Sequence, residues 1–375
     1  MSLRTRFARK IAVCLAAAVL AIVATACGGS SSSNSNGGSS SGSGSQGSSG
    51  SSGSKTTAAT TDVPPPSLPS GLAQFTQATP GSGKGLTVGF IQLDLGSPFP
   101  QDVQKGMVAQ AKRAGLTLVT CDSQLTDSKA LQCAQEFKTR GINGAIVFQG
   151  DASAAPSICK ALGNVPVIAV DITQQPCQKS FMGAANQYAG QLGGYELGKY
   201  FKQKFDCKYD AYISIEDEAV GEVNTERMGD MRSEFERVCG PIHGLHVLQE
   251  GASGSSATEQ SVTNVLTSLP GASHIIVVGL NEDDIVGAEA AARTQNRIND
   301  LYFVAQNFNP QLCALYSLPN WVGSVAYFPE KYGELAIPNI IKLIKHQAVP
   351  SQLLVKHQFV DRQNAKQIYP SFSCS

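Results

Sequence analysis

The sequence predicts an α/β protein whose folded part consists of two doubly wound parallel-sheet lobes. From about residue 84 onward, short runs of almost continuously apolar residues alternate with segments whose apolar residues recur at helical spacing. Such strands are typical of a parallel sheet covered by helices on both faces, and parallel strands need helical crossovers. About ten predicted strands over roughly 290 residues are too many for one small domain, so two lobes fit the length better.

The first half of this region predicts strands that alternate regularly with helices. Residues 86–93 (LTVGFIQL) form an apolar run of strand length, and residues 101–114 place Val103 and Met107 at helical spacing. The same reading then predicts a strand at 116–120, a helix at 128–140, a strand at 145–148, a helix at 154–162 and a strand at 166–170.

The second half repeats this alternation after a long amphipathic helix at residues 187–205. The predicted strands are 211–215, 246–250, 274–278, 301–305, 322–326 and 353–360, and the predicted helices between them are 222–239, 256–268, 283–294 and 331–345. Because the alternation of strands and helices repeats, we assign this half of the chain to a second lobe.

The N-terminal segment is typical of a targeting signal followed by a tether. Residues 1–10 are basic, residues 11–23 are apolar but short for a membrane span, and small residues precede Cys27. This pattern resembles the lipobox of bacterial lipoproteins, which implies a signal peptide at 1–26 and acylation of Cys27; an ordinary signal peptide and an uncleaved anchor helix are the alternatives. Residues 28–54 contain 24 Gly or Ser among 27 residues, so we expect a disordered tether over 27–83.

The charge composition argues against one class of partner. The chain carries 29 Lys+Arg and 29 Asp+Glu, and it contains no run of four or more Lys/Arg. A nucleic-acid partner is therefore not expected. Ten cysteines favour an oxidising, extracytoplasmic compartment.

Polar and aromatic residues follow the predicted strands. In open parallel sheets, ligands bind beyond the carboxyl ends of the strands. Turn formation and helix capping are the alternative role for any single residue of this kind. The residues at these positions are Asp94 with Phe99, Gln149 with Asp151, Asp171, Asn281, Asn307 and Tyr327.

The order of these motifs resembles the type I periplasmic solute-binding proteins of ABC importers, in the ribose/galactose-type sugar-binding group. The resemblance spans roughly residues 84–360. It rests on VGFIQLDLGSPF at 88–99, AIVFQGD at 145–151, PVIAVD at 166–171, FMGAAN at 181–186, TERMG at 225–229 and NEDDIVG at 281–287.

The resemblance implies a hinge that the chain crosses three times, with an N-terminal lobe of 84–185 plus 328–352 and a C-terminal lobe of 186–327 plus 353–375. It implies that a small polar ligand is held by Asp94, Phe99, Gln149, Asp171, Arg227, Asn281, Asn307 and Tyr327. Surface charge for Arg227 and core packing for Phe99 are the alternative roles. Departures from the ribose-type pattern at Ser97, Pro100, Ile172 and Asn307 argue against ribose itself.

Eight cysteines remain beyond Cys14 and Cys27. Eight cysteines allow 105 pairings. Pairing of neighbours keeps every bridge within one implied lobe and leaves the hinge free, whereas free buried thiols are the alternative. The neighbouring pairs are Cys121 with Cys133, Cys159 with Cys177, Cys207 with Cys239 and Cys313 with Cys374.

No catalyst or metal site is evident in the sequence. The five His occur in no HExxH motif, and the folded region lacks GxSxG. The absence of these motifs favours a binding protein without a cofactor. The resemblance implies a monomer, lipid-anchored outside the cytoplasm, that delivers a sugar or polyol to an ABC permease and its ATPase. The rival is a sensory protein that presents a sugar, nucleoside, amino acid or signal molecule to a membrane receptor kinase.

Overall fold

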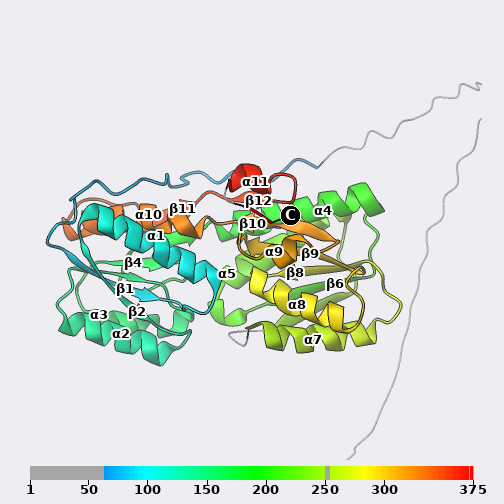
Figure 1. Cartoon of the computed structure of the whole chain (residues 1–375), viewed down its shortest axis with the longest axis horizontal. Helices are drawn as coiled ribbons and strands as arrows, with labels where there is room; N and C mark the ends of the chain where they lie inside the picture. Colours follow the sequence, from blue (N-terminus) through cyan, green and yellow to red (C-terminus); the bar gives the residue numbers. More distant parts are fainter. Residues whose placement is uncertain (1–62, 250–253, 371, 375) are drawn as a thin grey trace, which may run out of the picture. The chain divides into compact units, whose positions relative to one another are not determined.

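The computed structural model describes residues 63–249, 254–370 and 372–374 (Figure 1). The described residues form one compact unit, within which the strands assemble into two sheets. The predicted signal peptide, Cys27 and the Gly/Ser-rich part of the tether lie outside the described residues. Within the described ranges, no helix combines the length and the apolar character needed to cross a bilayer.

The first sheet belongs to the N-terminal lobe and is entirely parallel. The central strands β3 and β4 are buried along their whole length, which explains why they read as continuous apolar runs. The strand order is β11 (Gln352–Val355), β5 (Gln178–Ala184), β4 (Val167–Val170), β3 (Gly144–Val147), β1 (Thr87–Gln92) and β2 (Thr117–Asp122).

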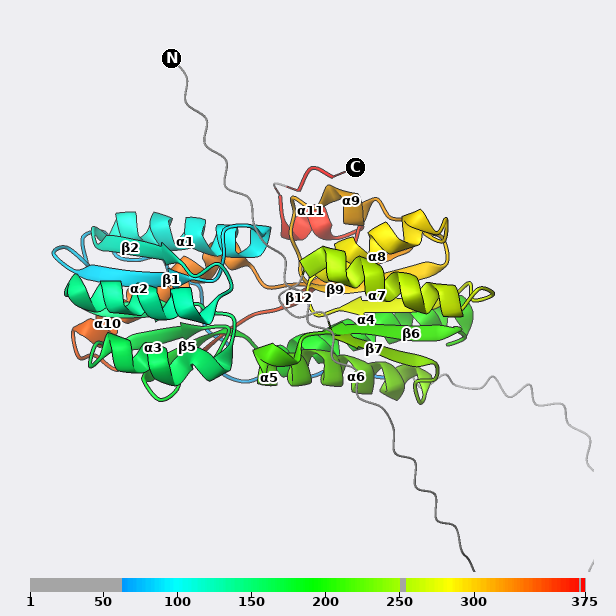
Figure 2. The ribbon, with the colours of Figure 1, turned by 90° about the horizontal axis from the view of Figure 1, so that it is seen from below.

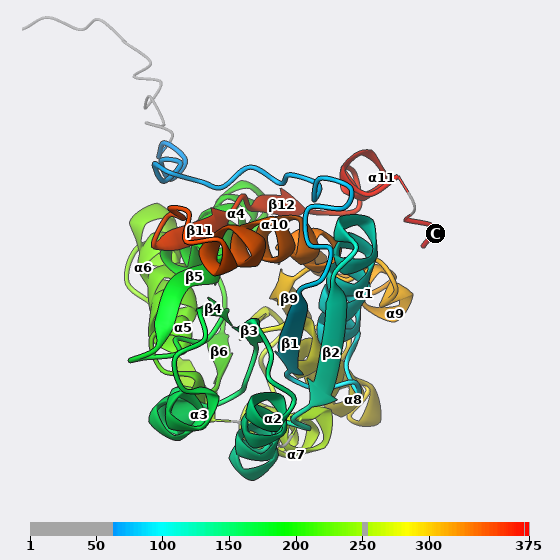
Figure 3. The same cartoon turned by 90° about the vertical axis from the view of Figure 1, so that its left-hand side faces the viewer.

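Two pairs of helices enclose this sheet (Figure 3). One face packs against α1 (Pro98–Ala114) and α10 (Tyr332–Ile344), and the other packs against α2 (Asp127–Thr139) and α3 (Ala155–Leu162). The helix α1 and the start of α10 approach closely because Gly106 and Gly333 face each other; a Cβ on Gly333 would lie 2.1 Å from the Gly106 carbonyl oxygen.

The second sheet belongs to the C-terminal lobe and is parallel except for its last strand, β12, which is antiparallel to β10. Its order is β12 (Gln358–Val360), β10 (Trp321–Ala326), β9 (Leu301–Asn307), β8 (Ile275–Gly279), β6 (Ala211–Glu216) and β7 (Leu245–Gln249). One face packs against α4 (Asn186–Phe205) and α6 (Asp230–Cys239), and the other against α7 (Gly254–Ser268) and α8 (Glu282–Thr294) (Figure 2). The short helices are α5 (Glu222–Asn224), α9 (Cys313–Tyr316) and α11 (Ala365–Ile368).

The chain passes between the lobes three times: from β5 into α4, from β10 into α10, and from β11 into β12. The fold class is therefore confirmed as two parallel-sheet lobes joined by a three-crossing hinge. The single strand predicted over residues 353–360 is wrong. The third crossing, at Lys356 and His357, divides it into β11 and β12, which lie in different sheets. A run of apolar residues cannot show such a division, because each half has the same local pattern.

Residues 63–83, which we call the strap, pack against the folded body instead of continuing the tether predicted over 27–83 (Figure 1, blue trace). Leu72 forms a parallel bridge with Leu354, and Ala78 is buried and donates its N–H to Gln110 at 2.8 Å. Phe75 packs edge-on against Phe328, with 6.3 Å between the ring centroids. Three spaced apolar anchors are enough to dock a segment whose overall composition is polar.

Replacing Phe75 with Ala tests whether the strap contributes to stability. The ring packs against the apolar cores of both lobes, and the Lys331 ammonium lies 5.6 Å from its centroid. We expect the variant to lose about 1–2 kcal/mol of unfolding free energy in urea denaturation. The matched control is Leu68→Ala, also in the strap but 60% exposed, which should stay within about 0.5 kcal/mol of the parent. Equal stability of all three proteins would show that the strap is not docked.

Disulfide bonds join Cys121 to Cys133, Cys159 to Cys177, Cys207 to Cys239, and Cys313 to Cys374. The prediction of neighbouring pairs is confirmed. Two bonds lie in each lobe, so none of the four links the lobes.

Candidate functional site

A cavity of about 600 Å³, which we call the cleft, lies between the carboxyl ends of the two sheets. Its volume falls within the usual range for small-molecule sites, about 300–1,000 Å³. Both lobes line it. The apolar lining includes Leu93, Phe99, Pro100, Phe148, Ile172, Val220, Val223 and Leu280, and the polar lining includes Asp151, Asp171, Arg227, Asn281, Asp283 and Asn307.

Asp171 follows β4 and projects into the base of the cleft from the N-terminal lobe. Its backbone is left-handed, with φ of 55°. Its Oδ1 accepts hydrogen bonds from Tyr332 Oη at 3.2 Å and from the Ala184 N–H at 3.3 Å. Gly183 is required beside it, since a Cβ there would lie 2.4 Å from Asp171 Oδ1. Burial raises the pKa of Asp171 to about 6, although the positive charge of Arg227 opposes that shift.

Arg227 reaches the same region from the C-terminal lobe. The helix predicted over residues 222–239 is interrupted by a π-helical turn at Thr225–Gly229, which contains Arg227. Turns of this kind often occur at functional sites. The guanidinium is buried; its Nε donates to Asn186 Oδ1 at 2.7 Å, and its Cζ lies 4.6 Å from the centroid of the Tyr327 ring. Asn186 thus orients the guanidinium from the first crossing.

Aromatic rings form the floor of the cleft. Phe99, in the first turn of α1, lies edge-on to Phe148, Tyr327 and Tyr332, with centroid separations of 6.4, 6.4 and 5.8 Å. Tyr327 itself lies outside the cleft lining: it is fully buried, and its hydroxyl donates to Gln306 at 2.6 Å. Its role in this structure is to support Phe99 and Arg227 from below.

Asn281 and Asn307 line the cleft from the C-terminal lobe. Asn281 is also the N-cap of α8: its side chain accepts from the Asp284 N–H at 3.1 Å in a capping box. Asn307 ends β9 with a φ of 94°, and its buried Oδ1 accepts no hydrogen bond within the described part of the chain. A buried amide oxygen without a donor is a position where a ligand hydroxyl can compensate.

Asp94 and Gln149 lie outside the cleft lining. The carboxylate of Asp94 accepts from the backbone N–H groups of Gly96 and Ser97 and from the Ser97 hydroxyl, so it holds its own loop together. Gln149 is buried and accepts from the Asp151 N–H at 2.8 Å. Both follow strands, as the sequence pattern requires. The Asp94 carboxylate satisfies groups of its own loop, whereas the buried Nε2 of Gln149 has no hydrogen-bond partner among the described residues.

The acidic residues at the start of α8 separate into two groups. Asp283 and Asp284 line the cleft, whereas Glu282 is buried beneath it and accepts from Tyr316 Oη at 2.5 Å and the Asn309 N–H at 2.7 Å. Burial raises the pKa of Glu282 to about 8. No group of three or more His, Cys, Asp or Glu side chains in the described ranges is placed to hold a metal ion.

His357 is a hinge residue that sequence reasoning missed, whereas Asn186 was expected at a lobe crossing but not as the partner of Arg227. His357 is 2% exposed on the third crossing, accepts from the Ala185 N–H at 2.9 Å and bonds to the Ala326 carbonyl at 3.1 Å. One imidazole therefore connects all three crossings. The single signal available in the sequence was a lone His between two short apolar runs.

Comparisons with known proteins agree with this architecture. A family model described as a periplasmic binding protein domain matches residues 88–348. The ribose import binding protein of Escherichia coli (strain K12) is 22% identical over 293 residues, which cover 74% of this chain and 91% of that protein.

Solved structures of binding proteins share the fold. The fructose-binding periplasmic domain of a hybrid two-component system has a TM-score of 0.66 at 17% identity, covering 76% of this chain and 93% of that one. An ABC transporter periplasmic solute-binding protein from Actinobacillus succinogenes 130z, with bound D-allose, has a TM-score of 0.64 at 17% identity, covering 75% and 99%. The chain belongs to the periplasmic binding proteins, and within them to the type I proteins of the ribose/galactose group.

Proposed function

We propose that this protein captures an uncharged sugar or polyol in the cleft and delivers it to the permease of an ABC import system, which is driven by a cytoplasmic ATPase. The family is extracytoplasmic. In this proposal Cys27 carries a lipid anchor, the Gly/Ser-rich tether lets the body move near the membrane, and the protein acts as a monomer without a cofactor.

The observation that carries the proposal is that Asp171 and Arg227 line the base of the cleft from opposite lobes. A carboxylate accepts from sugar hydroxyls and a guanidinium donates to them, so one vicinal diol can be engaged from both sides. The ring of Phe99 offers an apolar face against the C–H groups of a sugar. Contacts to both lobes exist only when the lobes are close, so a ligand shifts the hinge equilibrium toward closure.

Calorimetry tests this function directly. Residues 61–375, titrated with ribose, allose, galactose, fructose and myo-inositol, should bind at least one of these compounds. Galacturonate is the matched control, because its carboxylate would meet Asp151, Asp171 and Asp283 around the cleft and should weaken binding relative to galactose. The proposal is wrong if no neutral compound binds or if the uronate binds best.

A sensory role is the second candidate, since the fructose-binding relative is part of a two-component system. The cleft chemistry is the same for both roles. Uptake of a radiolabelled ligand in cells that lack the protein separates the two roles. If the protein serves import, its loss lowers uptake. If it is a sensor, its loss leaves transport of that ligand intact and abolishes a transcriptional response.

A further inference from the structure

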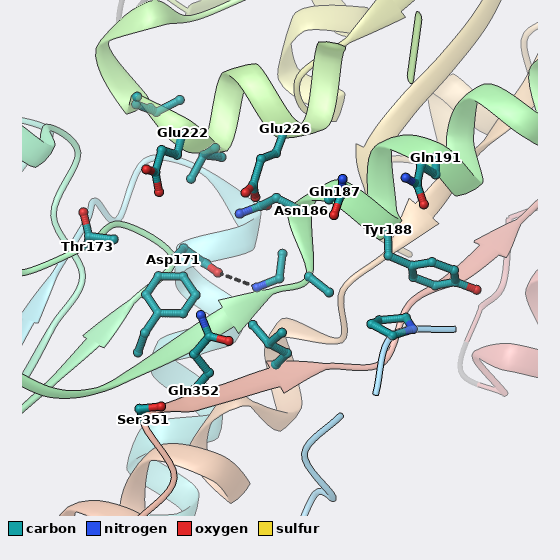
Figure 4. A pocket seen from close by; sticks show the side chains of 18 of the residues that line it. Asp171, Thr173, Asn186, Gln187, Tyr188, Gln191, Glu222, Glu226, Ser351 and Gln352 are labelled. Carbon is teal, nitrogen blue, oxygen red and sulfur yellow. Dashed lines mark hydrogen bonds between the residues drawn. The ribbon is translucent and has the colours of Figure 1, made fainter. Parts of the chain in front are cut away.

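A second cavity, of about 950 Å³, adjoins the cleft and shares Asp171, Val220 and Val223 with it. We call it the side chamber (Figure 4). Both lobes line it. Residues 67–69 of the strap, which precede the first strand in the sequence, also line it. One sugar ring is far smaller than either space, so a ligand confined to the cleft leaves the side chamber unused.

Uncharged hydrogen-bonding groups surround much of the side chamber. In Figure 4, Asn186, Gln187 and Gln191 lie along the first turns of α4, and Ser351 and Gln352 lie on the opposite side at the start of β11. Amides and hydroxyls both donate and accept, as sugar hydroxyls do.

Phe181 gives the side chamber an apolar platform. It lies on β5 directly beside Gln352 of β11 and lines the chamber. Its side chain is half-buried, and it belongs to none of the hydrophobic clusters formed by the described residues. A phenyl ring that is left out of the core and faces a polar cavity is suited to stacking on a sugar face.

The charge of the side chamber restricts what it accepts. Asp171, Glu222 and Glu226 line it, and no Lys or Arg is among its described lining residues. Figure 4 shows Glu222 and Glu226 facing the space above Asp171. Burial, together with the neighbouring Glu222 and Asp230, raises the pKa of Glu226. An anionic group, such as a phosphate or a uronate, is repelled here, whereas a neutral or amine-bearing group is accepted.

We propose that the ligand is a disaccharide or glycoside that places one ring in the cleft against Phe99 and Arg227, and a second, uncharged or amine-bearing unit in the side chamber against Phe181. The inference rests on the proposed function, because it extends the same site. It assigns specificity for ligand length to residues of β5, β11, α4 and the strap.

The test uses the full-length protein in detergent, titrated with lactose, melibiose, maltose, cellobiose and xylobiose and with their components galactose, glucose and xylose. At least one disaccharide should bind roughly tenfold more tightly than either of its components. Phe181→Leu should remove that gain and leave monosaccharide affinity unchanged. The matched control is Tyr195→Leu, a half-buried aromatic residue on α4 that lines neither cavity, and it should preserve both affinities.

The outcomes distinguish this inference from the function on which it rests. If monosaccharides bind as tightly as every disaccharide, or if the gain survives Phe181→Leu, the side chamber is not a subsite while the proposed function stands. If no disaccharide binds but a compound of the calorimetric panel does, this inference is overturned and the proposed function stands; if no compound of either panel binds, both are overturned. Should Phe181→Leu fail to fold, Gln187→Ala, at an exposed position that lines the side chamber, gives the same comparison.

Discussion

Replacing Asp171 with Asn is expected to stabilise the folded protein at pH 8 and to weaken ligand binding by roughly 100-fold. Burial raises the pKa of this carboxyl from 3.8 to about 6. Between these values the native protein holds a proton that the unfolded chain has released, so stability falls as the pH rises through this window and stays lower above it. A shift of this size corresponds to about 3 kcal/mol at pH 8. Asn keeps the acceptor for Tyr332 and Ala184 and removes the buried charge.

Urea denaturation at pH 4 and at pH 8 checks the effect on stability. The unfolding free energy of the variant should exceed that of the parent at pH 8 and differ little from it at pH 4. Affinity for the best sugar should fall by roughly 100-fold, because the hydroxyls lose an ionised acceptor. Asp206→Asn is the matched control, since Asp206 has the same left-handed backbone, with φ of 52°, but a side chain that is 90% exposed. A variant at Asp171 that is less stable than the parent at pH 8, or that binds the sugar as tightly as the parent, would contradict this account.

Replacing His357 with Ala is expected to weaken the hinge and to cost about 3 kcal/mol of unfolding free energy. The change leaves the Ala185 N–H and the Ala326 carbonyl without their buried partner and opens a space beside Tyr327, whose ring centroid lies 4.5 Å from that of the imidazole. Burial lowers the pKa of His357 to about 3. The native ring therefore stays neutral while the unfolded chain takes up a proton, so its contribution falls as the pH drops from 6.5 toward 3.

Thermal unfolding at pH 7 and pH 5 measures this effect in the parent and the variant. The difference between the two proteins should be smaller at pH 5. The control is His346→Asn, because His346 is exposed and has a left-handed backbone that Asn tolerates. If His357→Ala unfolds at the parent temperature, the imidazole does not hold the crossings together.

Features with a local signature could be predicted from the sequence. Continuous apolar strands specified the two parallel sheets, because a strand buried on both faces has no polar side. Asp171, Asn281 and Asn307 could be placed at the cleft because each follows or ends a strand at the carboxyl edge of its sheet. Their contact with a ligand remains a prediction.

Features that depend on packing between distant segments could not be predicted. The strap docks through Leu72, Phe75 and Ala78, which are too few to stand out in a Thr/Pro-rich stretch. His357 acquires its partners only when the three crossings converge, and Asn186 contacts Arg227 only when α4 packs against the π-helical turn. The turn that carries Arg227 departs from the α-helix within a segment whose sequence predicts one continuous helix. Asp94 occupies an expected position, yet its carboxylate satisfies its own loop.

Small-angle X-ray scattering of residues 61–375, with and without the best sugar from the calorimetric panel, tests most directly whether the lobes close on a ligand. The radius of gyration should decrease at saturating sugar in the parent protein and stay constant in Asp171→Asn at the same concentration. A parent protein that binds the sugar with no change in radius, or a variant that contracts as the parent does, would contradict capture between the lobes.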